Sequence, residues 1–383
     1  MVVADRGIPE YFRPEYYDEI NSILRLESEP LEALKTYAAS AANDDYLRGT
    51  IMRLRDALFR PGGGEAVSSE TARSLMDDAA KPFGRDAGMF HAIVLLSEMR
   101  AVRDRYRQRR IPDDILIDTF SDVGVWMRHS KQNRGVWGIG VPGWLFKHVA
   151  CRLFKIGRLQ YYHMPWDKKA HVYRHRTTGR LSVFPAGGVR IRRDGWVDGT
   201  NGRYDEEGAW DCFFEAGEDV IVGHPTTDEG RVLRERATLP AGEWELLLRE
   251  GSPVLDVHVQ EGEKLDPEQV RDSMRRALTF YRSHFPELEA KAFVCTSWLL
   301  CPAFSRILPP ESNIAAFRRT FRLVPHKDND AQLFERVFGT DRATALTMPA
   351  RTRLQRIVLD QAAKGEELVG GSGFLPADQV ESP

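Results

Sequence analysis

The chain has 383 residues, of which 42% are hydrophobic and 29% are charged, and its formal net charge is −2 at pH 7. This composition is typical of a soluble globular protein with about two domains of roughly 150 residues each. The near-neutral charge, with a sequence pI of about 6.6, argues against nucleic acid or an anionic membrane as the main partner.

Two further features concern the compartment and a possible metal. The first residues, MVVADRGIPEYFRPEYYDEI, lack the basic-then-apolar pattern of a signal peptide, and no apolar run approaches the ~20 residues of a membrane span. The four cysteines are too scattered for a disulfide framework. Cys295 and Cys301 stand six apart without a second Cys/His pair, which does not match zinc ligands. We therefore expect a reduced, cytoplasmic protein without a bound metal.

The first part of the chain, residues 1–155, is predicted to be a helical domain because its apolar residues recur with a period of 3.6. One helix is expected over 86–110, and it should stop before Pro112 because the residue preceding a proline disfavours helical backbone. Another is predicted over 141–157, with Gly157 as a left-handed residue at its end. The stretch RPGGGEAVSSE, residues 60–70, is predicted to be a flexible break.

After residue 155 the pattern changes to short aromatic or β-branched segments separated by turn signals, which predicts an antiparallel meander. The segment 253–260, PVLDVHVQ, is a predicted strand. A helix follows, with Asp266 as N-cap and Pro267 as its first residue. The segment 291–300, KAFVCTSWLL, is the next predicted strand. Strand, helix and strand at this spacing predict a right-handed crossover that joins two parallel strands.

These elements divide the chain into three predicted parts of an α+β protein. The helical domain, residues 1–155, is followed by a mixed-sheet domain over 156–326. A helical C-terminal extension covers 327–383, and its tail after Phe374 is predicted to be disordered because of its composition.

The predicted crossover also carries a family resemblance. VLDVHVQEGEKLDPEQVRDSMRRALTFYRSHFPE, followed by FVCTSWLL and LPPESNIAAFRRTF, resembles the C-terminal domain of a bacterial family of GNAT-like acyltransferases. In that family a helical N-acyltransferase domain comes first, and FHAIVLLSEM, IPDDILIDTFSDVGVWM and GRLQYYHM are similar to it and to its junction. The resemblance implies a helical N-terminal domain followed by a GNAT-like mixed β-sheet domain flanked by helices.

The resemblance also implies a reaction, in which an acyl group passes from acetyl-CoA or another acyl-CoA to a small-molecule acceptor amine or hydroxyl. The two parallel strands are expected to diverge, so that the pantetheine arm pairs with the backbone of Val257, Val259 and Gln260. The pyrophosphate is expected near Gly262 and at the start of the next helix, where N–H groups favour anions. The remaining implied cofactor contacts are Arg271, Arg275 and Asn313. Ser312 or Asn313 could instead serve only as a helix N-cap.

Two departures from the superfamily pattern keep a second class of function open. The phosphate loop usually contains several glycines, whereas QEGEKLD contains Gly262 alone. The carboxylates of this loop are unfavourable beside a pyrophosphate unless Lys264 or a nearby arginine compensates. The tyrosine that often protonates the leaving CoA thiolate is replaced by Thr320. The alternative function is therefore a catalytically silent GNAT-like sensor or scaffold that binds acyl-CoA.

Two side chains are candidates for the chemistry itself. His258 shares a strand face with Asp256, and with an ordinary pKa near ~6.5 it could accept the proton of an attacking amine. The alternative is a core histidine that is hydrogen-bonded under the sheet. Cys295 could act as a nucleophile if it were partly exposed beside a base. Free cysteine on a strand is usually a small buried hydrophobe, so we expect direct attack by the acceptor.

Overall fold

The computed structural model describes residues 8–60 and 66–381, so the centre of the predicted flexible break, residues 61–65, lies outside the described residues. The chain divides into two compact units. The first extends to Ile156 and includes Gln160–Tyr162, whereas the second consists of Gly157–Leu159 and the residues from His163 onward.

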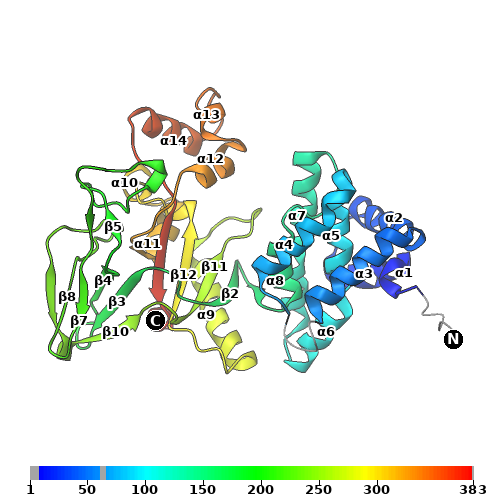
Figure 1. The fold of residues 1–383 in the computed structure, drawn as a ribbon, viewed down its shortest axis with the longest axis horizontal. Coiled ribbons are helices and arrows are strands. Elements are labelled where there is room, and N and C mark those ends of the chain that lie inside the picture. Colours follow the sequence, from blue (N-terminus) through cyan, green and yellow to red (C-terminus); the bar gives the residue numbers. More distant parts are fainter. Residues whose placement is uncertain (1–7, 61–65, 382–383) are drawn as a thin grey trace. The chain divides into compact units, whose positions relative to one another are not determined.

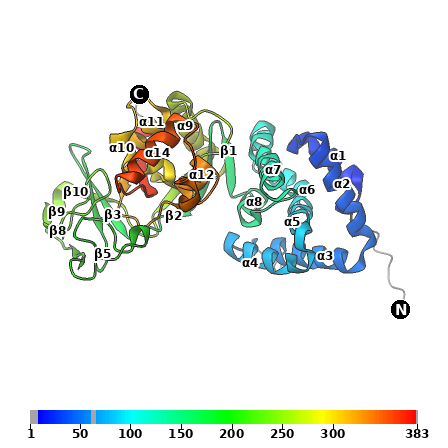
Figure 2. The same cartoon turned by 90° about the horizontal axis from the view of Figure 1, so that it is seen from above.

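The first unit is helical (Figures 1 and 2). Its helices are α1 (Pro14–Leu24), α2 (Ser28–Asn43), α3 (Asp45–Phe59), α4 (Ser69–Ala80), α5 (Ala87–Leu96), α6 (Met99–Gln108), α7 (Asp113–Arg134) and α8 (Pro142–Val149). The single helix predicted before Pro112 is thus two helices, α5 and α6. The break has a local cause: the Ser97 hydroxyl donates to the carbonyl of Val94 at 2.6 Å, and buried Glu98 pairs with Arg55.

The prediction of one helix over 141–157 is wrong in its second half. Helix α8 ends at Val149, Cys151 adopts a left-handed φ of 54°, and the strand β1 (Leu153–Ile156) follows. All four residues of β1 are buried, and a short apolar run of this kind cannot be distinguished from a buried helical turn by periodicity. Gly157 does adopt the predicted left-handed conformation, with φ 63°, but it joins two strands.

The second unit is built on a mixed sheet. Its strands include, in spatial order, β2 (Leu159–Pro165), β11 (Pro253–His258), β12 (Ala292–Ser297), β14 (Gly371–Pro376) and β13 (Arg322–Val324). β11 and β12 are parallel and are joined by α9 (Pro267–His284), which confirms the predicted crossover. Asp266 is the N-cap of α9, and its carboxylate accepts from the backbone N–H groups of Glu268 and Gln269, as the capping pattern predicts.

The second unit also contains small antiparallel sheets, one of which, formed by β3 (Ala170–His175), β4 (Leu181–Pro185) and β10 (Trp244–Leu248), packs on the central sheet. The others comprise β7 (Phe214–Ala216), β8 (Val220–Gly223) and β9 (Ala237–Pro240); and β5 (Arg190–Ile191) with β6 (Trp210–Asp211). Val172 and Val183 of the small sheets pack on Val254, Val294 and Phe374 of the central sheet. The predicted antiparallel pairing is confirmed, but β10 pairs with β3 rather than with its neighbour in sequence.

The C-terminal segment differs from its prediction. Two helices precede it, α10 (Phe304–Ile307) and α11 (Asn313–Thr320). The segment itself contains α12 (Ala331–Phe338), α13 (Arg342–Ala345), α14 (Arg353–Ala363) and α15 (Ala377–Glu381). Residues 375–381 are not a disordered tail, because Leu375 and Pro376 pair with β12 as part of β14 (Gly371–Pro376) and α15 follows. Residues 382–383 of the predicted tail lie outside the described residues. β14 lies between β12 and β13 and pairs with both. Phe374 is fully buried, so the last strand completes the sheet and its hydrophobic core.

Candidate functional site

The clearest polar pair of the second unit lies at the end of β11. Nε2 of His258 is 2.8 Å from Oδ2 of Asp256, and the two side chains are 29% and 18% exposed. Both project from one face of β11, because residues two apart on a strand share a face. A carboxylate 2.8 Å from Nε2 would stabilise a protonated imidazole, which suits His258 to act as a general base.

This pair lies where β11 separates from β12. The ladder between the two strands comprises Val254–Ala292, Leu255–Phe293 and Asp256–Val294. β11 nevertheless continues to His258 and β12 to Ser297, while β12 stays paired with β14 up to Ser297. The backbone near Val257 and Val259 therefore has no ladder partner on β12, as expected of strands that diverge.

The loop after β11 is held by an arginine that the sequence analysis did not identify. Arg158 is buried and donates through Nε to the carbonyl of Lys264 at 2.8 Å. Its Nη1 donates to Gln260 at 3.1 Å and its Nη2 to Glu263 at 2.7 Å. Burial lowers the pKa of Arg158, and the Glu263 carboxylate opposes this shift. Three carbonyls of one short loop thus converge on a single guanidinium.

With these carbonyls turned toward Arg158, the loop has backbone N–H groups that are available to a ligand. Within residues 8–60 and 66–381, the backbone N–H groups of Gly262, Lys264 and Leu265 make no hydrogen bond. Gly262 is exposed and has φ 107°, a conformation that favours glycine. Because Asp266 occupies the N–H groups at the start of α9, the groups suited to an anion lie in the loop rather than at the predicted helix terminus.

The charged side chains around this loop differ in the hydrogen bonds and ion pairs that they form. Arg275 donates through Nε to the carbonyl of Val380 at 3.2 Å, which ties α9 to α15. Arg271, one turn earlier, is exposed and forms no ion pair or hydrogen bond among the described residues. The exposed Glu261 carboxylate lies 3.9 Å from Arg336. Of the two predicted arginine contacts, only Arg271 therefore has an uncommitted guanidinium.

The helix α11 carries the predicted asparagine. Ser312 is its N-cap, and its hydroxyl accepts from the N–H of Ala315 at 3.2 Å. Asn313 is half-buried, and its amide makes no hydrogen bond within the described part of the chain. Because Ser312 caps the N-terminus of α11, the Asn313 side chain is not needed for capping. At the other end, the Thr320 hydroxyl donates to the carbonyl of Ala316 at 3.2 Å.

The two neighbouring cysteines are packing residues. Cys295 is 1% exposed, and burial raises the pKa of its thiol well above the usual value, with a further contribution from the Asp256 carboxylate. Because Asp256 aligns with Val294, strand alternation places Cys295 on the opposite face from His258. The structure therefore does not bring Cys295 and His258 together on one face.

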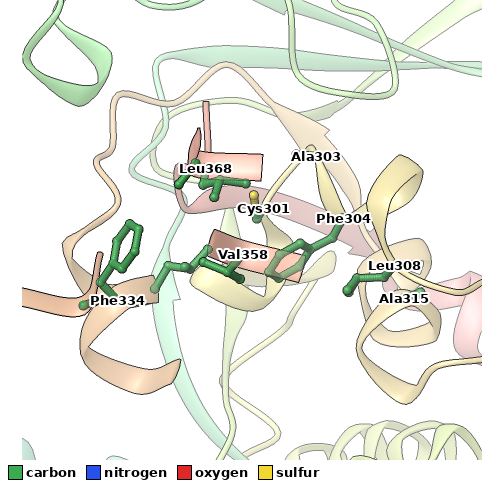
Figure 3. Packing of buried hydrophobic residues seen from close by; sticks show 11 residues of the cluster. Cys301, Ala303, Phe304, Leu308, Ala315, Phe334, Val358 and Leu368 are labelled. Carbon is green, nitrogen blue, oxygen red and sulfur yellow. The ribbon is translucent and has the colours of Figure 1, made fainter. Parts of the chain in front are cut away.

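Cys301 lies in a hydrophobic cluster with Phe304, Leu308, Val358 and Leu368 (Figure 3). Burial raises the pKa of Cys301 to about 12. No three His, Cys, Asp or Glu side chains among the described residues are grouped in a way that could hold a metal ion. No described helix is long and apolar enough to span a membrane.

Two protein families match the chain. The N-acyltransferase N-terminal domain matches residues 16–151, and the GNAT-like C-terminal domain matches residues 153–375. The chain belongs to this GNAT-like acyltransferase family. The resemblance noted in the sequence is thereby confirmed, as is the α+β fold with its helical N-terminal part.

Solved structures of similar fold include an acyltransferase in complex with decanoyl-CoA and teicoplanin, and a mutant acyltransferase with octanoyl-CoA. Each has 21% sequence identity, covers 95% of this chain and 88% of the other, and superposes with a TM-score of 0.61. An acyltransferase with CoA and 10C-teicoplanin has the same identity and TM-score. No curated protein matches the chain.

Proposed function

We propose that this protein transfers an acyl group from acyl-CoA to the amine of a small-molecule acceptor by direct attack. The observation that carries the proposal is the Asp256–His258 pair, which stands where β11 separates from β12. The family membership supports acyl transfer in general. Octanoyl-CoA and decanoyl-CoA in structures of similar fold favour a medium-chain donor, and teicoplanin in one of them favours a small-molecule acceptor.

The residues of the proposed site bind the acyl-CoA and transfer the proton. Backbone groups of residues 257–260 align the thioester and polarise its carbonyl, because they have no ladder partner on β12. The N–H groups of Gly262, Lys264 and Leu265 receive the pyrophosphate, with Arg271 and Asn313 as side-chain contacts. His258 takes the proton of the attacking amine, and Asp256 stabilises the imidazolium that forms.

The competing function is a silent acyl-CoA sensor or scaffold. The observation that favours it is the start of α9, where the Asp266 carboxylate already occupies N–H groups that could bind a phosphate. Calorimetry with acetyl-CoA, octanoyl-CoA and decanoyl-CoA separates both proposals from an inert scaffold. Thiol release with a panel of amines then separates an enzyme from a sensor: binding with amine-dependent release supports the transferase, whereas binding without release contradicts it.

A pair of variants tests the role of His258 as the general base. His258→Gln removes the base but keeps a polar side chain on β11, and we expect a fall in turnover of roughly 10²- to 10⁴-fold with unchanged acyl-CoA affinity. His284→Gln, on α9, serves as the matched variant and should keep full turnover. Unchanged turnover in His258→Gln would remove the histidine from the mechanism.

A further inference from the structure

A polar row crosses the face of the central sheet at the point where β11 and β12 diverge. Val294 of β12 aligns with Asp256 on one side and with Phe374 of β14 on the other. Two residues further along the same face, Thr296 aligns with Ser372. His258 stands two residues beyond Asp256, so it is level with Thr296 across the unpaired part of the two strands. The imidazole and the Thr296 hydroxyl therefore lie on the same face of the sheet, on opposite strands, where the two strands diverge.

The Thr296 side chain is held in one orientation. Its Oγ1 lies 2.9 Å from Oγ of Ser372, and either oxygen can be the donor. Ser372 is 2% exposed, whereas Thr296 is exposed. On each side of Ser372, a Cβ on Gly371 or Gly373 would meet backbone atoms within 3 Å. β14 thus lies close to its neighbouring backbone, and Ser372 is hydrogen-bonded to the exposed hydroxyl of Thr296.

We propose that Thr296 is a catalytic residue that donates a hydrogen bond to the thiolate sulfur as it leaves, and that Ser372 positions it. The inference rests on the proposed acyl transfer and identifies the group that stabilises its leaving atom. Thr320 cannot supply this hydrogen bond while its hydroxyl donates to Ala316. A thiolate that develops beside Thr296 gains a charge-assisted hydrogen bond, which is about twice as strong as a neutral one.

The acceptor nitrogen attacks the thioester carbon and forms the amide bond, and its proton passes to the imidazole of His258. The carbon–sulfur bond breaks, and its electron pair goes to the sulfur. Thr296 remains an alcohol, because a thiol is far more acidic than an aliphatic hydroxyl. The products are the amide and CoA thiolate, which takes its proton from the imidazolium or from water after release.

The test compares Thr296→Val, which keeps the shape without the donor, with Thr296→Ser, which keeps the donor. With acyl-CoA, Thr296→Val should lower kcat roughly 10- to 100-fold at unchanged acyl-CoA affinity, because one donor to a developing anion is lost. Thr296→Ser should restore most of the turnover. Ser372→Ala should give a smaller loss, because Thr296 keeps its donor but loses its anchor.

A second readout separates catalysis from structure. Each variant is assayed with two truncated donors that carry the same acyl group, one on N-acetylcysteamine and one on a more acidic aryl thiol. The acidic thiolate needs less stabilisation, so Thr296→Val should impair the first donor several-fold more than the second. This ratio does not depend on the fraction of active enzyme, so poor folding of a variant cannot imitate it.

Equal impairment with both donors, or full activity of Thr296→Val, would overturn the role of Thr296 while leaving the proposed function intact. The absence of amine-dependent thiol release from the wild type, despite acyl-CoA binding, would overturn both proposals.

Discussion

The guanidinium of Arg158 offers a quantitative test of how the loop after β11 is held. Arg158→Met removes three hydrogen bonds to the carbonyls of Gln260, Glu263 and Lys264 but keeps most of the apolar side-chain volume. Hydrogen bonds to a charged group are worth about 1.5–3 kcal/mol each, and desolvation of the buried guanidinium offsets several kcal/mol of their sum. We therefore expect the free energy of unfolding to fall by about 2–4 kcal/mol.

Urea unfolding measures this loss, and hydrogen exchange of peptides from 260–266 measures its local part. Arg158→Lys keeps one donor group and should lie between wild type and Arg158→Met. Arg276→Met is the control, because Arg276 is 48% exposed and forms a weak ion pair with Asp272 at 3.8 Å; its effect should stay within about 0.5 kcal/mol. Wild-type stability and unchanged exchange of the loop in Arg158→Met would refute this account of Arg158.

Three further predictions concern packing, pH and the thiol. Gly371→Ala places a Cβ 2.1 Å from the Leu300 carbonyl oxygen, and should cost at least about 1–3 kcal/mol in urea unfolding, whereas Gly242→Ala, with no atom within 4 Å, should be near neutral. Burial lowers the pKa of four histidines: His91, His171, His224 and His326. Below pH ~6.5 the unfolded chain therefore binds more protons than the folded protein. The urea concentration at the unfolding midpoint should decrease as the pH is lowered from 7.5 to 5.5, and a midpoint that stays constant or increases would contradict this. Cys295→Ala should retain acyl transfer, and loss of activity together with a trappable acyl-enzyme in the wild type would support the covalent route instead.

The features that could be predicted from the sequence depend on local signals. The strand 253–258 and the helix after Asp266 follow from alternation, capping chemistry and helical spacing, which act within a few residues. The same alternation placed Asp256 and His258 on one face, where the structure pairs them.

The features that could not be predicted depend on distant parts of the chain. Arg158 contacts carbonyls more than 100 residues away, and no local pattern distinguishes it from a surface arginine. The glycine-rich segment 370–373 has low β-propensity, yet it becomes a strand because β12 and β13 pair with it on both sides. The role proposed for Thr296 likewise depends on Ser372, which only this pairing brings beside it.

The central claim is that the diverging ends of β11 and β12 hold the thioester of an acyl-CoA beside the Asp256–His258 pair. A crystal structure with a thioether analogue of decanoyl-CoA, which cannot transfer its acyl chain, tests this most directly. We expect the sulfur to lie between His258 and Thr296, and the pyrophosphate to accept hydrogen bonds from the N–H groups of Gly262, Lys264 and Leu265. An analogue bound elsewhere, or an opening between the strands filled by side chains of the protein, would contradict the account.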